Sequence, residues 1–300
     1  MIDRPVFIAG LDRTGKTPMR LAIESLASIA IARRAELWTH HLGRHGSLRD
    51  DGEARRAVDA LLRDRQVAAL VDDADALLAE LLDGPRTYPR LFALIGRQHA
   101  RRRGTSRWGD QTALLERRAP EILDAFEGAC IIHMIRDPRD RYAAARRAGG
   151  VGRGGVGGAI EEWVESVALA DRYASRWPTR YLTVRFEDLA TSPVATIRGV
   201  MHLLREPTPT VDEFAEVSPD LAAGVGLHES LPRRTVAIIE GRCGAAMARH
   251  GYEPETPTLS VSERLGMVIV DRPLSAAAAL AHRLRSAPAR RQPDRAAIGR

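Results

Sequence analysis

Glycines, a lysine and hydroxyl side chains follow one another near the amino terminus at the spacing of a phosphate-binding loop. The segment Gly10-Leu-Asp-Arg-Thr-Gly-Lys-Thr17 fits the pattern G-x-x-x-x-G-K-[ST]. In such a loop the glycines let the backbone approach a phosphate, and successive N–H groups at the start of a helix form a nest for an anion. Lys16 adds a point charge, and Thr14 and Thr17 add hydroxyl donors. The spacing predicts a site for the phosphate chain of a nucleotide.

Lys16 is also the only lysine of the chain, in which all other basic residues are arginines. Such a composition is expected where lysine is replaced by arginine at every position that accepts either residue. The compact ammonium of lysine and the planar fork of arginine are not equivalent against a crowded phosphate. The retained lysine therefore indicates a position that needs an ammonium group.

The elements around this loop must be a strand before it and a helix after it. Residues 6–9, Val-Phe-Ile-Ala, form an apolar run between Pro5 and Gly10 and predict a buried parallel strand. Thr17 is expected to cap a helix that has Pro18 at its first position. That helix would bury one face, formed by Met19, Ile23, Leu26 and Ala30.

Apolar runs and helical periodicities alternate along the rest of the chain, and this alternation predicts an α/β fold with a central parallel sheet flanked by helices. The expected strands are 130–135 and 181–186, and a flexible, glycine-rich loop is expected at 149–158. Gly150, Gly152 and Gly155 fit G-x-G-x-x-G, but they follow a helix, and a dinucleotide site needs a strand there. The expected helices are 53–103 throughout, 140–147, 159–177, one from Pro193, and 233–250.

Composition limits the partners and the compartment. The net charge is +6, but residues 282–300 hold six arginines and one acid, so the rest of the chain is nearly neutral and no nucleic-acid partner is expected. We predict one domain over 1–272, with 53–103 as a helical insert, and a basic, disordered tail over 273–300. No apolar stretch is long enough to span a membrane, and residues 1–9 lack the pattern of a secretory signal. Two distant cysteines predict neither a disulfide framework nor a metal site, which favours the cytoplasm.

Five segments then resemble, in order over residues 5–252, the motifs of the sulfotransferase family. The family commonly has P-x-F-I-x-G-x-x-R-S-G-T-T at the 5′-phosphosulfate loop, then W-G-E-K-T-P, R-D-P-R-D, Y-E-D-L and L-G-Y. The corresponding segments here are Pro5-Val-Phe-Ile-Ala-Gly-Leu-Asp-Arg-Thr-Gly-Lys-Thr17, Trp108-Gly-Asp-Gln-Thr112, Ile131-Ile-His-Met-Ile-Arg-Asp-Pro-Arg-Asp140, Tyr181-Leu-Thr-Val-Arg-Phe-Glu-Asp-Leu189 with Ser192-Pro193, and Arg249-His-Gly-Tyr252.

The resemblance implies a P-loop-like three-layer fold and 3′-phosphoadenosine 5′-phosphosulfate (PAPS) as the sulfuryl donor. It implies that the donor binds to the loop residues Gly10, Arg13, Thr14, Gly15, Lys16 and Thr17. It also implies that Arg136 binds the 3′-phosphate. From the residues alone, Arg136 ends a strand at the carboxyl edge of a parallel sheet, where ligands bind in open α/β folds. An ion pair of Arg136 with Asp137 or Asp140 is the alternative.

The expected chemistry is in-line attack of an acceptor hydroxyl on sulfur, with a phosphate oxygen as the leaving group. Arg13 and Lys16 are the candidates for stabilising the leaving group, by the same electrostatic logic that serves phosphoryl transfer. No metal is required. The candidates for the base are Glu36, His40 and His41, and a histidine is slightly favoured because it titrates near neutral pH. His133 is expected to be a core histidine, and His228 has no local support for a role.

This sequence departs from the family pattern at three positions. Lys16 replaces the usual threonine, Gln111 replaces a lysine, and Ala144 replaces the serine that binds the 3′-phosphate. Two alternatives therefore stay open: a P-loop kinase or NTPase that uses ATP with Mg²⁺, and a non-catalytic nucleotide-binding protein of the same fold. The acceptor is a hydroxyl of a small molecule, a lipid or a saccharide, and the insert offers either a lid or a dimer face.

Overall fold

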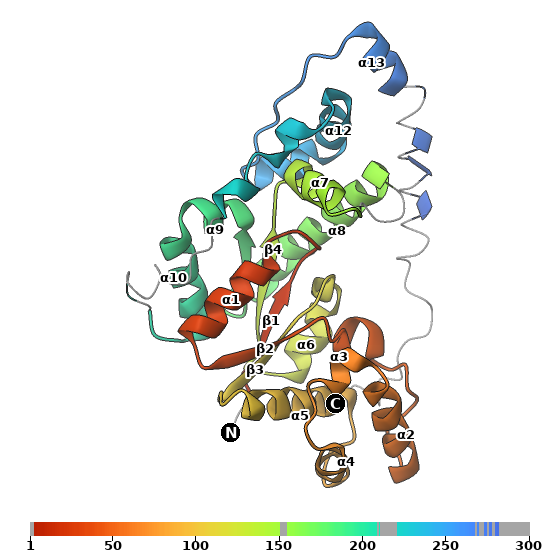
Figure 1. Ribbon diagram of the computed structural model, residues 1–300, viewed down its shortest axis with the longest axis vertical. Helices are drawn as coiled ribbons and strands as arrows, with labels where there is room; N and C mark the ends of the chain where they lie inside the picture. The colour runs from red at the N-terminus through yellow and green to blue at the C-terminus, as the bar shows by residue number, and fades with distance from the viewer. Residues whose placement is uncertain are drawn as a thin grey trace.

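A parallel β-sheet forms the centre of the computed structural model, which describes residues 3–150, 155–208, 210, 221–267 and single positions between 269 and 281. Within this part the sheet has five strands in the order β2-β3-β1-β4-β5, and all neighbouring strands are parallel (Figure 1). The strands are β1 (Val6–Ala9), β2 (Ile29–Arg33), β3 (Arg107–Gln111), β4 (Cys130–Ile135) and β5 (Tyr181–Arg185). The predicted parallel α/β fold is confirmed.

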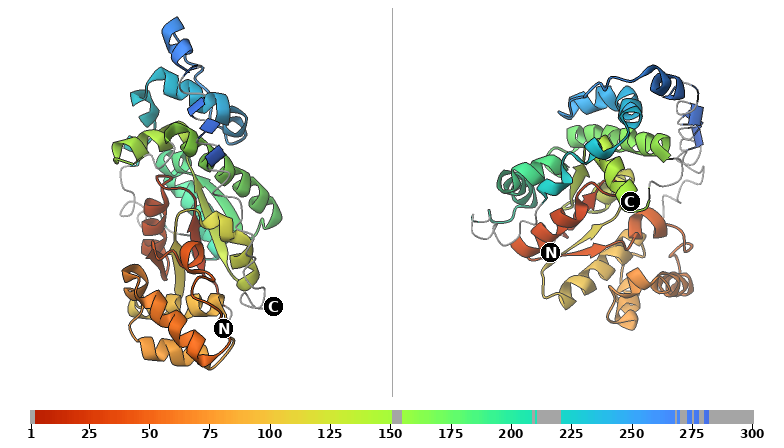
Figure 2. Two further views of the ribbon diagram at one scale, coloured as in Figure 1. Left: turned by 90° about the vertical axis from the view of Figure 1, so that its right-hand side faces the viewer. Right: turned by 45° about the horizontal axis from the view of Figure 1, so that its top comes forward.

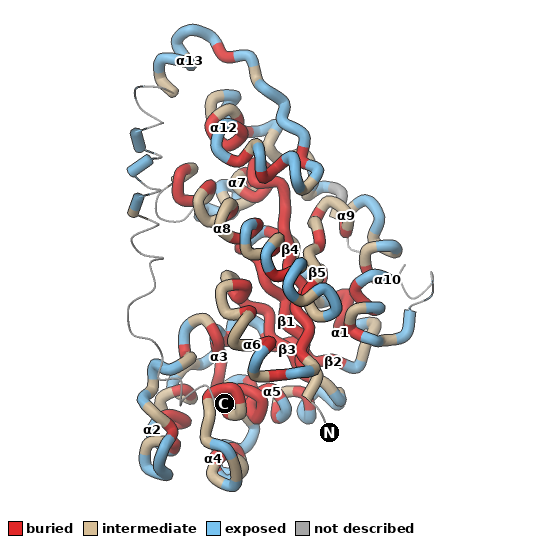
Figure 3. Tube along the Cα trace, turned by 180° about the vertical axis from the view of Figure 1, so that it is seen from behind, coloured by how far each residue is buried: buried red, intermediate tan, exposed pale blue. Residues whose placement is uncertain are grey.

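Strand β1 shows how the layers arise, because successive side chains of a strand point to opposite faces of the sheet. Phe7 and Ala9 belong to one hydrophobic cluster, whereas Val6 and Ile8 belong to another. The second cluster is completed by helices α1 (Lys16–Leu26) and α10 (Pro193–Leu204). All four residues of β1 are fully buried, and the strands form the buried centre of the trace in Figure 3.

Helices inserted between β2 and β3 supply most of the first cluster and lie at one end of the molecule (Figures 1 and 2). The prediction of helix over 53–103 is confirmed, with short breaks between the elements. Each of these helices begins after a residue whose side chain accepts a hydrogen bond from a first-turn N–H, as expected of an N-cap. The helices are α2 (Asp51–Leu62), α3 (Arg65–Ala68), α4 (Ala74–Leu82) and α5 (Tyr88–Arg102).

A third hydrophobic cluster, at the opposite end of the molecule, joins helices that follow β4 in the chain. The described helices here are α7 (Pro138–Arg147), α8 (Gly155–Arg176) and α12 (Arg233–Arg249). The remaining elements are η1 (Leu37–His41), η2 (Leu115–Arg118), α6 (Ala119–Ala125), α9 (Phe186–Thr191), η3 (Ala222–Gly224), η4 (Leu227–Ser230) and α13 (Val261–Gly266).

Two expectations about the first helix are wrong. The helix begins at Lys16, not after a Thr17 cap, because Gly15 takes the cap position with a left-handed backbone (φ 89°). It ends at Leu26, and Ala30 lies in β2, not on the helix face. The segment Ile29-Ala-Ile-Ala-Arg33 pairs along its length with β3, and this sheet pairing outweighs the helical spacing of Ala30.

The glycine-rich segment also differs from its prediction. Residues 155–158 form the first turn of α8 instead of a loop, which moves the start of that helix from 159 to Gly155. Residues 151–154, and residues 282–300 of the predicted tail, lie outside the described part of the chain. Among the helices that the structure describes, none has the length and apolarity needed to cross a membrane.

Candidate active site

The loop after β1 has the backbone that its glycines predict. Gly10 (φ 113°) lies so close to β4 that a Cβ there would be 2.2 Å from the Met134 carbonyl oxygen. At Gly15 (φ 89°) a Cβ would be 2.5 Å from the Phe186 ring. Side chains are therefore excluded at both positions by space as well as by backbone conformation. Arg13, between them, also has a positive φ of 69°.

Lys16 is buried under this loop and donates hydrogen bonds to the carbonyl oxygens of Gly10 (2.7 Å) and Leu11 (2.5 Å). Its ammonium lies 3.8 Å from the exposed carboxylate of Asp12. Burial lowers the pKa of Lys16 to about 8, although Asp12 and Glu116 oppose the shift. The hydroxyl of Thr14 donates to the carbonyl oxygen of Leu11 at 2.8 Å. The loop is thus held by its own side chains around a cation that titrates close to neutral pH.

A buried carboxylate that sequence reasoning missed anchors the base of the loop. Glu116 in η2 is fully buried, and its Oε2 accepts a hydrogen bond from the backbone N–H of Gly10 at 2.9 Å. Its Oε1 accepts from the Ser166 hydroxyl at 2.7 Å. The neighbouring His133 and these hydrogen bonds keep the pKa of Glu116 below its ordinary value despite burial. No local pattern marks Glu116, because its partner lies 106 residues away.

His133 is a core residue, as predicted. Its ring is fully buried, with Nδ1 2.7 Å from the Tyr181 hydroxyl and Nε2 2.9 Å from the Ser166 hydroxyl. Burial lowers the pKa of His133, although the Glu116 carboxylate opposes the shift. Together with Ser166, His133 links the loop anchor to β5.

An open cavity of about 900 Å³ lies at the carboxyl edge of the sheet, where the loop, the end of β2 and the end of β4 meet. Of the predicted site residues, Arg13, Gly15, Lys16, Thr17, Glu36 and Arg136 line it. Gly10, Thr14, His40 and His41 are not among its lining residues. Cavity residues that were not predicted as site residues include Arg33, Arg34, Thr112, Arg141, Tyr142, Glu162 and Phe186.

The two histidines occupy different surroundings. His41 is buried, with Nδ1 3.0 Å from Nε2 of His45 and Nε2 3.3 Å from the Asp64 carboxylate. Burial lowers the pKa of His41. His40 is exposed on the surface of η1. The structure therefore brings Glu36, and neither histidine, to the cavity that holds the loop.

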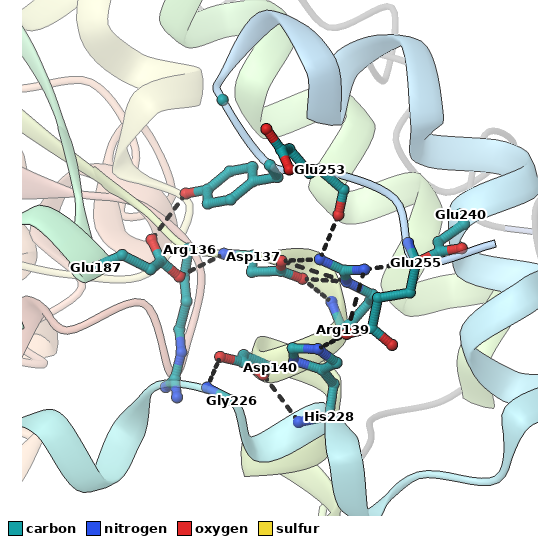
Figure 4. Close-up of polar contacts among 12 residues, drawn as sticks. Arg136, Asp137, Arg139, Asp140, Glu187, Gly226, His228, Glu240, Glu253 and Glu255 are labelled. Atoms are coloured by element: carbon teal, nitrogen blue, oxygen red, sulfur yellow. Dashed lines mark hydrogen bonds and ion pairs between the residues drawn. The ribbon is translucent and has the colours of Figure 1, made fainter. Parts of the chain in front are cut away.

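Arg136 leaves β4 and crosses to the loop. Its guanidinium donates to the carbonyl oxygens of Arg13 (2.9 Å) and Gly224, and it stacks over the Phe186 ring at 4.3 Å from the centroid. Nε of Arg136 is buried and has no hydrogen-bond partner in the described residues. The ion pair with Asp137 is made by Arg139, which also pairs with Glu240 at 2.5 Å (Figure 4).

The segments that resemble family motifs converge at this point in space. Glu187 accepts from the backbone N–H of Asp137 at 2.9 Å and from the Tyr252 hydroxyl at 3.0 Å. The R-D-P-R-D turn, the F-E-D-L helix and the G-Y segment therefore share one buried hydrogen-bond network. Their function in the fold is to hold the end of β4, from which Arg136 extends.

A second network holds η3 and η4 against α7. The buried carboxylate of Asp140 accepts from the backbone N–H groups of Gly226 and His228, both at 2.8 Å, and from the His228 ring (Figure 4). Nε2 of His228 lies 2.5 Å from Glu255. These hydrogen bonds raise the pKa of His228 to about 9, so the ring is charged at neutral pH.

We expect His228→Gln to lower the free energy of unfolding at pH 7 by roughly 1–2 kcal/mol, below the range for a fully buried charged hydrogen bond because Glu255 is half-exposed. Since folding raises the pKa of His228, the stabilisation is complete below about pH 6.5, the ordinary pKa of histidine. It is lost as the pH rises through about 9. Urea titrations between pH 6 and 10 measure this. The exposed His202→Gln variant should keep the wild-type profile, and an unchanged profile in His228→Gln would contradict the assignment.

Two buried polar side chains, Asp110 and Gln111, lie at the end of β3. The Asp110 carboxylate accepts from the Thr112 hydroxyl at 3.1 Å, and burial raises the pKa of Asp110 to about 7. Its Oδ2 and the Oε1 of Gln111 are buried without a hydrogen-bond partner in the described residues. Gln111 lines the cavity at the position where the family usually has lysine.

Residues 5–210, more than two thirds of the chain, match the model of a family described as the sulfotransferase family. The chain belongs to the sulfotransferase family. This membership favours the sulfotransferase prediction over the kinase or NTPase alternative. Within the described residues of this family member, no group of His, Cys, Asp and Glu side chains is arranged to hold a metal ion.

Three known proteins share low sequence identity with this family member. Carbohydrate sulfotransferase 3 of Homo sapiens is 25% identical over 179 residues, which cover 47% of this chain and 37% of the relative. The chain thus matches well under half the length of that protein. Among solved structures, the sulfotransferase domain of the Synechococcus PCC 7002 olefin synthase is similar with a TM-score of 0.49 and 18% identity, covering 92% of this chain and 95% of that one. The sulfotransferase domain of the curacin biosynthetic pathway has a TM-score of 0.48 and 16% identity, covering 89% and 96%.

Proposed function

We propose that this protein transfers a sulfuryl group from PAPS to a hydroxyl acceptor in the cavity at the carboxyl edge of the sheet. The observation that carries the proposal is the joint presence, on one cavity, of the glycine loop with Lys16 and the strand-end Arg136. A cytoplasmic location, a single domain over 1–272 and an acceptor from the small-molecule, lipid or saccharide classes belong to the same proposal.

The residues of the cavity fit such a donor. Gly10 and Gly15, where any Cβ would collide with Met134 or Phe186, give the loop the positive-φ backbone that an anion-binding nest uses. Arg13, Thr14, Lys16 and Thr17 would hold the 5′-phosphosulfate. Arg136, whose planar fork suits a terminal phosphate, would hold the 3′-phosphate after exchanging the Gly224 carbonyl for it.

The donor supplies an activated sulfuryl group, and the chain supplies charge and a proton acceptor. The acceptor oxygen forms a bond to sulfur while the bond from sulfur to the 5′-phosphate oxygen breaks. Lys16 and Arg13 stabilise the negative charge that grows on that phosphate oxygen. Glu36 takes the hydroxyl proton, since it is the proposed base that lines the cavity. The products are the sulfate ester and adenosine 3′,5′-bisphosphate.

The test is a calorimetric titration of the protein with adenosine 3′,5′-bisphosphate and, separately, with ATP and Mg²⁺. We expect the bisphosphate to bind at least tenfold more tightly. A preference for ATP with Mg²⁺ would favour the kinase or NTPase alternative. Turnover of PAPS with any hydroxyl compound would exclude the non-catalytic alternative.

Arg136→Ala should weaken binding of the bisphosphate by about 1.5–3 kcal/mol, the range for a hydrogen bond to a charged group, and change the affinity for ATP little. The same titration measures both. Arg198→Ala removes an exposed arginine of α10 and should leave both affinities unchanged. Equal losses for the two nucleotides in Arg136→Ala would refute the 3′-phosphate role.

A further inference from the structure

Two arginines at the end of β2 line the cavity on the side away from Arg136. Arg33 is the last residue of β2, and Arg34 follows it with a left-handed backbone (φ 57°). Both side chains are exposed to the cavity. Within the described part of the chain, no hydrogen bond or ion pair joins either guanidinium to another residue. Within the described residues, the guanidinium groups of Arg33 and Arg34 therefore do not hold other parts of the fold in place.

The backbone after β2 adopts a strained conformation that places these side chains at the cavity. Arg34 and Glu36 both have positive φ angles, which are unfavourable for residues other than glycine. Between and after them, Ala35 and Leu37 are buried in the core. The buried residues anchor the turn, and Arg34 and Glu36 point to the opposite side. Strain of this kind is maintained where the surrounding structure enforces it and is frequent at binding sites.

The sheet order separates these arginines from the proposed donor site. β2 lies on the far side of β3 from β1, whereas β4, which carries Arg136, is the other neighbour of β1. Neighbouring strands are about 4.8 Å apart, so the ends of β2 and β4 are separated by roughly 14 Å. A nucleotide that runs from the loop toward Arg136 and Phe186 leaves the β2 side free for the acceptor.

Of the other arginines of the cavity wall, Arg13 belongs to the loop proposed to hold the 5′-phosphosulfate, and Arg136 and Arg141 are already engaged by the protein. Arg136 donates to two carbonyl oxygens, and Arg141 donates to the carbonyl oxygens of Asp12 (3.2 Å) and Ala159 (3.1 Å) and pairs with Glu162 at 2.8 Å. Arg33 and Arg34 differ in that their donors face the cavity. The positive charge of Arg34 also lowers the pKa of Lys16. The guanidinium of Arg34 therefore acts electrostatically on the loop proposed to bind the donor.

Gln111 adds an independent sign that a polar ligand fits on this side. It pairs in register with Arg33 across β2 and β3, is 5% exposed, and has an Oε1 without a hydrogen-bond partner in the described residues. Leaving a buried acceptor unsatisfied is unfavourable, and such a group in a cavity wall is expected to receive a hydrogen bond from a ligand. A hydroxyl of the acceptor would supply that donor.

We propose that the acceptor carries a carboxylate or phosphate group, which Arg33 and Arg34 bind while a hydroxyl of the same molecule reaches Glu36. This inference rests on the sulfuryl transfer proposed above and names its acceptor class, a hydroxyl compound with an anionic group. Two forks of donors suit either anion, because arginine binds both groups through paired hydrogen bonds. Arg33 and Arg34 are then the residues that determine acceptor specificity.

The experiment uses the full chain saturated with adenosine 3′,5′-bisphosphate, so that the probes cannot occupy the nucleotide site. Dissociation constants are measured by ligand-observed NMR for three matched pairs of hydroxyl compounds. Two pairs test the carboxylate: methyl β-D-glucuronide with methyl β-D-glucoside, and 4-hydroxyphenylacetate with 4-hydroxyphenylacetamide. The third, D-glucose 6-phosphate with D-glucose, tests the phosphate. We expect the anionic member of at least one pair to bind at least tenfold more tightly than its neutral partner.

The double variant Arg33→Gln/Arg34→Gln should reduce that preference to less than threefold and leave the affinity for the bisphosphate unchanged. Its matched control is Arg55→Gln/Arg56→Gln, an adjacent exposed pair on α2 with the same loss of charge, which should keep the preference. The proposal is overturned if no anionic member binds better than its partner, or if the preference survives in the double variant. Failure of the bisphosphate to bind wild-type protein would instead refute the proposed function. The dissociation constants of the three compound pairs, measured on the protein without bisphosphate, would then still test whether Arg33 and Arg34 bind an anion.

Discussion

Glu36→Gln lowers the turnover number for sulfuryl transfer by about 10²–10⁴-fold, because positioned general bases contribute in that range. Glutamine keeps the size of the side chain and its place on the cavity wall but cannot accept the hydroxyl proton. The measurement is the initial rate of sulfate ester formation from PAPS with any accepted hydroxyl compound. Calorimetry on the same variant should give an unchanged affinity for adenosine 3′,5′-bisphosphate.

The matched control is Glu127→Gln, which neutralises an exposed carboxylate in the turn before β4. We expect this variant to have wild-type rates. Since His40 and His41 lie off the cavity, His40→Gln and His41→Gln should each change the turnover number less than about tenfold. Full activity in Glu36→Gln would show that Glu36 is not the base. A large loss of the turnover number only in His40→Gln or His41→Gln would assign the base to that histidine.

Lys16→Ala should lower kcat/KM for PAPS by about 10²–10³-fold, the range found when one donor that stabilises developing negative charge is removed. The ammonium is the cation of the loop that is buried beside its carbonyl oxygens, so exposed arginines cannot replace it. Rates with PAPS measure the effect, and circular dichroism checks that the variant remains folded. Unchanged kcat/KM would refute the role of the loop.

The pKa of Lys16 adds a pH dependence to this prediction. Since burial lowers that pKa to about 8, the cation is present below pH 8 and is lost as the pH rises above it. Wild-type kcat/KM should therefore fall above pH 8, while the residual activity of Lys16→Ala should not fall in that range. A decline of equal size in both proteins would assign the titration to another group.

Local patterns predicted the loop and the end of β4 well. The strand, the glycines and the lysine are consecutive in the sequence, and their geometry depends on backbone conformations that only glycine adopts at Gly10 and Gly15. Arg136 follows an apolar strand directly, so its place at the sheet edge needs no information from distant residues. These parts could be predicted because neighbours in the sequence decide them.

The site features that could not be predicted depend on contacts between residues far apart in the sequence. Glu116 has its role only because η2 passes under Gly10, and no feature of its own segment indicates this. The sequence slightly favoured His40 or His41 over Glu36 as the base, but only Glu36 lines the cavity, because the turn after β2 directs it there. The strand β2 was missed because Ile29-Ala-Ile-Ala is short, and its pairing with β3 becomes visible only in the folded sheet.

The hydrogen bonds that hold Arg136 and Arg139 at the end of β4 can form only late in synthesis of the chain. Arg139 receives a carbonyl partner from Glu253, 114 residues later in the chain, and Arg136 receives one from Gly224. At about 5–20 residues per second, a ribosome adds 114 residues in roughly 6–23 s. A nascent chain that already has its glycine loop therefore still lacks the residues that hold Arg136. Premature termination before α12 would leave the buried charge of Arg139 without Glu240, and we expect such fragments to be substrates for proteolysis rather than nucleotide binders.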